Sequence, residues 1–353
     1  MYRADHVGSL LRPRELFDAP NNIQIQDKYI LEALHRQKEL GFRIFTDGEL
    51  RRRGFMTDFY DSVDGLDMDG SIARAWQGGA GNGRLTGIVV QAIKQKKRLT
   101  KHEVDFLKGH SPGDIKMTLP SANQFPAIAY KKGVSERAYK TYSEFLWDLV
   151  PIFKSEIEAL VSEGVQYIQL DAPRYSYYVD PKWRRYIRDE MGTDPESALH
   201  EAIRVDNACI KDVKRGGVSL AIHLCRGNNR SQWYAEGGYD PIAEKLFNEL
   251  NVDTFLLEYD SERAGTFEPL RFVPSDKTIV LGLVSSKIPQ LESPSNLTHR
   301  IEEARRYVPL ENLALSPQCG FASTNEGNRL TEDEQWRKLQ LVVETARTVW
   351  GTV

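Results

Sequence analysis

Two potential metal ligands, His223 and Cys225, stand two residues apart in the stretch LAIHLCRGN. Alternate residues of a β-strand point to the same face, so this spacing directs the imidazole and the thiol to one side. Residues 218–222 before them are mostly apolar and typical of a strand. An imidazole and a soft thiolate that point together suit zinc. A buried cysteine can equally be a small apolar residue, and we interpret Cys209 that way because its surroundings indicate an amphipathic helix.

Two more potential ligands, Glu258 in FLLEYD and Cys319 in LSPQCGF, raise the number to four. Two thiolates, a carboxylate and an imidazole around Zn²⁺ carry a net charge of about −1. Such a centre polarises a carbonyl poorly, but it keeps a bound thiol deprotonated. The set therefore predicts attack by a thiolate on an electrophilic carbon. For Glu258 the alternative is a salt bridge to Arg263.

Other polar residues also follow apolar stretches that read as strands. Ser9 ends the stretch DHVGS, Glu49 ends FTDGE, and Asp171 ends YIQLD. A carboxylate at the end of a buried strand is costly unless it is paired or bound to a metal. We therefore expect these side chains at the same rim as the ligands. The alternatives are a turn or cap role for Asp171, before Pro173, and a cap role for Ser9.

Short apolar segments alternate with longer amphipathic segments along the chain. Eight strands alternating with helices predict an α/β fold, a (β/α)8 TIM barrel, whose active site lies at the carboxyl ends of its strands. The rival is an open doubly wound sheet. The glycine-rich run at residues 78–83 is weak evidence for it, because no clear strand precedes the run. The predicted strands span residues 4–9, 43–49, 114–120, 167–173, 218–225, 254–260, 278–285 and 313–319.

The helices are predicted from apolar periodicity and from their end signals. Gly41 ends the first helix, Pro151 breaks a long stretch into a pair, and Asp194 and Thr331 are N-caps. The predicted helices span residues 29–40, 136–162, 195–214, 241–249, 297–307 and 332–350. We predict a single catalytic domain over residues 1–353, with an inserted excursion at about 50–113 beside the barrel mouth. We expect the basic run at residues 94–98 in that excursion to be a solvated face.

Composition excludes several classes of protein. The 353 residues are 41% hydrophobic and 27% charged, with a net charge of −3. We therefore expect no nucleic-acid partner and no membrane span. Three cysteines argue against a disulfide framework and for a reducing compartment, so we expect a cytoplasmic protein.

At these residues the chain resembles the cobalamin-independent methionine synthase family. The matching segments are HVGSLLRP, FTDGE, YIQLDAP, HLCRGN, LLEYD and SPQCGF, spread over nearly the whole chain. The resemblance implies a barrel that holds Zn²⁺ through His223, Cys225, Glu258 and Cys319. It also implies that homocysteine takes a methyl group from a methyltetrahydrofolate or another methyl carrier. Glu49 and Asp171 would bind the homocysteine ammonium, and Ser9 would contact its backbone.

Two departures from the family pattern concern the methyl donor. Full-length enzymes carry a second barrel, and this chain matches only the catalytic one. In place of the family's proton-transfer histidine the segment reads LGLVSSKIPQLES, so Lys287 is the candidate catalytic residue. We expect a small-molecule thiol and a methyl donor as partners, with a homo-oligomer or a methyl-delivering protein as further options. The alternatives are alkyl transfer to another thiol, as in epoxyalkane:coenzyme M transferases, a non-catalytic zinc protein, and a metal-free uroporphyrinogen-decarboxylase-like barrel.

Several basic and aromatic residues lie near the predicted strand ends. The basic residues are Arg51, Arg52, Arg53, Arg226 and Lys287. Some of them could meet a substrate carboxylate or sulfonate, but we expect most to be exposed, because surface arginine is the common case. Trp76, Tyr175 and Trp233 lie in loops that we expect either to roof the pocket or to pack as ordinary loop residues.

Overall fold

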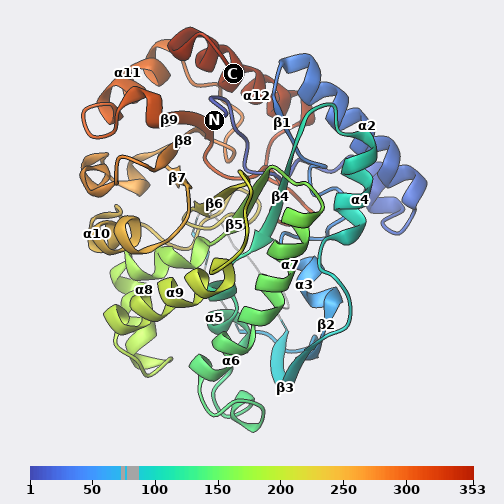
Figure 1. Cartoon of the computed structure of the whole chain (residues 1–353), viewed down its shortest axis with the longest axis vertical. Helices are drawn as coiled ribbons and strands as arrows, with labels where there is room; N and C mark the ends of the chain where they lie inside the picture. Colours follow the sequence, from blue (N-terminus) through green and yellow to red (C-terminus); the bar gives the residue numbers. More distant parts are fainter. Residues whose placement is uncertain (73–75, 78–86) are drawn as a thin grey trace.

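A curled sheet of parallel strands forms the centre of the computed structural model, which describes residues 1–72, 76–77 and 87–353 (Figure 1). Its strand order is β1-β4-β5-β6-β7-β8-β9. The predicted α/β architecture is confirmed, with seven strands in the parallel sheet. Their bounds are Ile44–Phe45 (β1), Asp114–Pro120 (β4), Tyr167–Asp171 (β5), Ser219–Leu224 (β6), Thr254–Glu258 (β7), Thr278–Val284 (β8) and Leu313–Pro317 (β9).

The first predicted strand, residues 4–9, is reduced to an isolated parallel bridge between Ala4 and Leu315 of β9. On its other side, the Leu10 amide donates to the Gly48 carbonyl at 2.9 Å. The N-terminal segment therefore lies between β9 and the segment that follows β1. β1 itself is short, and the left-handed backbone at Gly48 and Glu49, with φ of 71° and 55°, excludes a regular extension through these residues.

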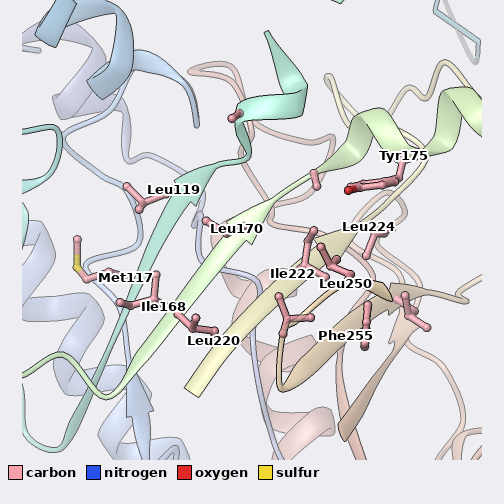
Figure 2. Packing of buried hydrophobic residues seen from close by; sticks show 14 of the residues in the cluster. Met117, Leu119, Ile168, Leu170, Tyr175, Leu220, Ile222, Leu224, Leu250 and Phe255 are labelled. Carbon is pink, nitrogen blue, oxygen red and sulfur yellow. The ribbon is translucent and has the colours of Figure 1, made fainter. Parts of the chain in front are cut away.

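Alternation along the strands divides the side chains between two layers. Leucine and isoleucine residues such as Ile168 and Leu220 point towards the helices, and Figure 2 shows this layer over β4, β5 and β6. The intervening positions form a second buried cluster that includes Tyr167 and Ala221. A strand repeats every two residues, so Asp171 and His223 share this inner face.

The helices surround the sheet (Figure 1). Helices overlap all six predicted stretches, but α4 (Lys101–His110) and α8 (Pro181–Asp189) were not predicted. Helix α2 (Ile23–Leu40) begins six residues before the predicted start, with Asn22 as its N-cap, and Gly41 ends it with φ of 99°. The long predicted stretch is a broken pair, with Pro151 in the first turn of its second member. Thr331 caps α12 through a capping box. The longer helices are α2 (Ile23–Leu40), α4 (Lys101–His110), α6 (Tyr142–Asp148), α7 (Val150–Ser162), α8 (Pro181–Asp189), α9 (Pro195–Ile210), α10 (Asp240–Glu249), α11 (Pro294–Ala304) and α12 (Glu332–Trp350).

A separate antiparallel pair, β2 (Val63–Asp67) and β3 (Ile88–Gln95), stands between β1 and β4 in the sequence. It follows the short helix α3 (Thr57–Ser62). The basic run at residues 94–98 is largely exposed, as expected, except that Arg98 pairs with Glu156 and Glu163. The glycine-rich run at residues 78–83 lies outside the described residues. Within the described part of the chain, the helices are too short or too polar to cross a membrane.

Candidate metal centre

His223, Cys225 and Cys319 come together at the carboxyl end of the sheet. Their potential ligand atoms all lie within 4.8 Å of one another. His223 is on β6, and Cys225 is the first residue after that strand. Cys319 comes two residues after the end of β9. All three side chains are buried. The structure thus brings together three of the four predicted metal ligands from two separate strands.

The polar atoms of this cluster suit a cation. Both ring nitrogens of His223 are buried and lack a hydrogen-bond partner among the described residues. A buried imidazole without partners is costly unless something else binds it. A hydrogen bond from Cys225 lowers the pKa of Cys319 well below its usual value, and His223 adds to the effect. A low thiol pKa favours the thiolate, which is the form that binds metals.

Glu258 ends β7 on the same inner face, but it is not a member of the three-residue cluster. Its Oε1 accepts from Arg263 Nε at 2.8 Å. Its Oε2 accepts from the Arg226 amide at 2.8 Å and from Gln318 Nε2 at 3.2 Å. Arg226 follows Cys225 and Gln318 precedes Cys319, so this carboxylate joins the two cysteine segments. The salt bridge considered for Glu258 is therefore present.

A cavity of about 510 Å³ opens over the cluster. The three candidate substrate-binding residues Ser9, Glu49 and Asp171 line it together with His223 and both cysteines. Its wall also includes the apolar residues Phe55, Met56, Tyr60 and Trp76 from the stretch after β1. The cavity therefore has a polar end at the cluster and an apolar wall from the predicted excursion.

Glu49 is held in an unusual backbone conformation at the edge of this cavity. Its φ of 55° is uncommon for a residue other than glycine, and such residues concentrate at functional sites. Its Oε1 accepts from the Thr118 hydroxyl at 2.8 Å. Its Oε2 is buried and has no hydrogen-bond partner among the described residues. One carboxylate oxygen is thus available to a ligand.

Asp171 and Ser9 flank the cluster on separate segments. Burial raises the pKa of Asp171 to about 7; the charge of His223 opposes this shift and that of Glu49 adds to it. Asp171 Oδ1 accepts from Gln169 Nε2 at 2.7 Å. Ser9 packs so tightly against Gly320 that a Cβ there would lie 2.0 Å from Ser9 Oγ. The chain after Cys319 and the N-terminal segment are therefore closely fitted.

Lys287 is buried but does not line the cavity. Its ammonium group donates to the Gly227 carbonyl at 2.9 Å, to Asn228 Oδ1 at 3.0 Å and to the Gln232 carbonyl at 3.4 Å. In the structure Lys287 thus stabilises the loop that follows Cys225.

The expectation that most of the rim arginines are exposed is wrong. Arg52 and Arg226 are buried. Arg52 pairs with Glu103 at 2.5 Å, and Arg226 donates to the Gly237 carbonyl at 3.0 Å. Burial is tolerated because each guanidinium group has acceptors. Arg53 is the exposed member of the set, with 67% of its side chain accessible.

The aromatic residues of the rim have different positions. Trp76 lines the cavity, with its ring centroid 5.2 Å from that of Tyr234. Tyr175 instead donates to Asp206, and Trp233 donates to Glu236.

Sequence reasoning missed Thr118, Gln169 and Arg12. Thr118 and Gln169 each stand two residues before a strand end, at positions that alternation assigns to the inner face. Arg12 donates to the carbonyls of Glu49, Arg52 and Ala322, and no pattern in the sequence indicated this role.

Comparison with known proteins identifies the family. Residues 16–348 match the family described as cobalamin-independent synthase, catalytic domain. The chain belongs to this family. The resemblance drawn from the six short segments is therefore confirmed. Membership in the cobalamin-independent synthase family points to a methyltransferase of the methionine synthase type.

Relatives of the chain cover nearly its full length. The uncharacterised protein YxjG of Bacillus subtilis (strain 168) is 39% identical over 369 residues, which cover 99% of this chain and 95% of that protein. A putative vitamin-B12-independent methionine synthase from Listeria monocytogenes is 31% identical, with a TM-score of 0.72 over 99% of this chain and 98% of that one. A B12-independent methionine synthase from Shewanella sp. W3-18-1, solved with selenomethionine, shares the fold, with a TM-score of 0.74, 19% identity and coverage of 98% and 97%.

Proposed function

We propose that this protein is a zinc-dependent enzyme that transfers a methyl group to the thiol of homocysteine and forms methionine. One observation carries the proposal: three ligand atoms within 4.8 Å of one another open onto the same cavity as Glu49 and Asp171. A thiol-activating centre and two carboxylates in one cavity suit a substrate that has both a thiol and an ammonium group. Membership in the cobalamin-independent synthase family supports the same reaction class.

The donor set fits zinc, because it offers two sulfur atoms and an imidazole whose ring nitrogens have no hydrogen-bond partner in the described part of the chain. His223, Cys225 and Cys319 would hold the ion, and Glu258 is the proposed fourth ligand at the neighbouring strand end. When bound there, zinc would supply the charge that keeps a substrate thiol deprotonated at neutral pH. Arg263, which now pairs with Glu258, would then keep its contact with Asp260.

The side chains around the cluster would bind and orient homocysteine. Glu49 and Asp171 accept from its ammonium group, and Ser9 contacts its backbone. In the transfer, the homocysteine sulfur forms a bond to the methyl carbon while the bond from that carbon to the donor breaks, and the donor keeps the electron pair. The apolar wall with Phe55, Met56 and Trp76 would bind the methyl carrier and exclude water.

The remaining parts of the chain fit one catalytic unit. Over the described residues, the parallel sheet has seven strands. We propose that the N-terminal segment at residues 4–9 occupies the remaining strand position and completes a (β/α)8 barrel over residues 1–353. Residues 50–113 would be an excursion that brings an apolar wall to the mouth. Lys287 would act on the reaction through the loop after Cys225. Three free thiols fit a cytoplasmic enzyme.

Replacing one ligand tests the metal centre. Cys319→Ala should lose most of the roughly one zinc ion that we expect per chain, because only two members of the cluster remain. Cys209→Ala is the matched control, since Cys209 is buried in α9 and does not line the cavity. Zinc is measured by elemental analysis after dialysis. Equal zinc content in both variants would contradict the proposed centre.

A further inference from the structure

Two inner-face residues form a layer directly behind the candidate ammonium-binding carboxylates. Thr118 of β4 and Gln169 of β5 are register partners in the sheet. Thr118 donates its hydroxyl to Glu49 Oε1 at 2.8 Å. Gln169 donates Nε2 to Asp171 Oδ1 at 2.7 Å. One oxygen of each carboxylate is thus held by a side chain of β4 or β5: Thr118 holds Glu49, and Gln169 holds Asp171.

A buried arginine determines which group donates in the hydrogen bond between Thr118 and Glu49. Arg52 Nη1 donates to Thr118 Oγ1 at 3.0 Å, and Arg52 Nη2 donates to the Thr118 carbonyl at 3.0 Å. A hydroxyl group has one proton, so Thr118 accepts from Arg52 and gives its own proton to Glu49. Glu103 holds Arg52 in place through contacts of 2.7 and 2.5 Å. The Glu49 orientation is therefore set by a chain of groups that the cavity does not reach.

A second contact fixes Gln169. Its Nε2 also donates to the Val7 carbonyl at 2.8 Å, so its amide nitrogen points along the inner face. Val7 precedes Ser9 by two residues and also lines the cavity. The Gln169 side chain therefore ties the orientation of Asp171 to the N-terminal segment.

We infer that Thr118 and Gln169 are positioning residues that give the cavity its selectivity for a thiol bearing an ammonium group. Each fixes one oxygen of a carboxylate, so that the rest of that carboxylate is aimed at the ligand without reorganisation. The inference rests on the proposed function and names the part of the protein that recognises the amino group. Neither residue would touch the substrate.

The test compares two thiols that differ only in the amino group. Binding of L-homocysteine and of 4-mercaptobutanoate to the zinc-loaded full chain is measured by isothermal titration calorimetry. Thr118→Val and Gln169→Met should each weaken homocysteine binding by about tenfold, because the carboxylates are no longer held in one orientation. Binding of 4-mercaptobutanoate should stay unchanged. Thr118→Ser keeps the hydroxyl and should retain the wild-type preference.

Controls separate positioning from a loss of folding. Thr345→Val makes the same change at a buried threonine of α12 that does not line the cavity, and it should bind both thiols as wild type does. If either positioning variant weakens the binding of both thiols equally, or of neither, the inference is overturned while the proposed function stands. If the wild-type protein shows no preference for homocysteine, the proposed function fails, and the inference fails with it.

Discussion

At the scale of single residues, the site consists of groups that are costly to bury unless they have partners. Among the described residues, neither buried ring nitrogen of His223 has a hydrogen-bond partner, and Glu49 has one buried oxygen of the same kind. These positions follow apolar stretches in the sequence, and the prediction that they meet at one rim came from that placement. The structure agrees for Ser9, Glu49 and Asp171, which line the cavity with His223, Cys225 and Cys319.

What the sequence could not predict is how each side chain is oriented. Glu258 and Lys287 also stand at or just after strand ends, yet neither lines the cavity. Glu258 accepts from Arg263, and Lys287 donates to groups of the loop at residues 227–232. The partner of a buried charged group is set by contacts between segments distant in sequence, such as Gln318 with Glu258. Short residue spacings do not predict such contacts.

Lys287 provides a direct test at this scale. Lys287→Met removes a buried ammonium group that three acceptors of one loop share, so the free energy of unfolding should fall by about 1–3 kcal/mol. Urea denaturation measures this change. Lys108→Met, at an exposed position of α4, should have little effect. A Lys287→Met protein of wild-type stability that no longer binds homocysteine would instead assign Lys287 a direct role in the cavity.

At the scale of elements, six of the eight predicted strands match the observed bounds to within two residues at each end, whereas helices α4 and α8 were not predicted. Thr331, Asn22 and Gly41 mark helix ends through local hydrogen bonds and backbone conformation, and residues 332–350 were predicted with the observed bounds. The N-terminal segment was predicted as a strand because it is apolar, but only Ala4 forms a bridge to β9. Strand pairing depends on distant partners and on the turn at Gly48 and Glu49, and local pattern does not determine it.

Asp206 connects three elements behind the cavity. It lies on α9 and accepts from the Ser121 hydroxyl at 2.7 Å and from the Tyr175 hydroxyl at 2.9 Å. Ser121 follows β4 and Tyr175 follows β5, so one carboxyl group ties both loops to the helix. Burial raises the pKa of Asp206 to about 6, although both hydrogen bonds lower it.

This shift predicts a pH dependence of stability. The folded state binds the Asp206 proton more tightly than the unfolded state, whose pKa is near 3.8, so this group stabilises the fold at low pH. Its contribution is full below pH 3.8 and is lost as pH rises through 6. Between pH 5 and pH 7.5 the stability lost through this group amounts to about 1.4 kcal/mol. Asp206→Asn should make the dependence of the unfolding free energy on pH shallower by about that amount in urea titrations; identical slopes would contradict the assignment.

At the scale of the whole molecule, the curled sheet brings distant segments to one rim. Ser9, Glu49, Asp171, His223 and Cys319 are spread over more than 300 positions of the sequence, yet they line one cavity of about 510 Å³. Parallel strands place their carboxyl ends at one edge, which is why a count of strand ends could predict this convergence. The sequence could not predict which apolar residues of the stretch after β1 line the cavity, because this depends on packing rather than on the order of strands.

The central claim is that the cluster of His223, Cys225 and Cys319 binds zinc with a position open to the substrate thiol. X-ray absorption at the zinc edge, with and without L-homocysteine, measures this directly on the zinc-loaded protein. We expect two sulfur ligands at about 2.3 Å before addition and three after it. A set of zinc ligands that stays the same when homocysteine binds would contradict it.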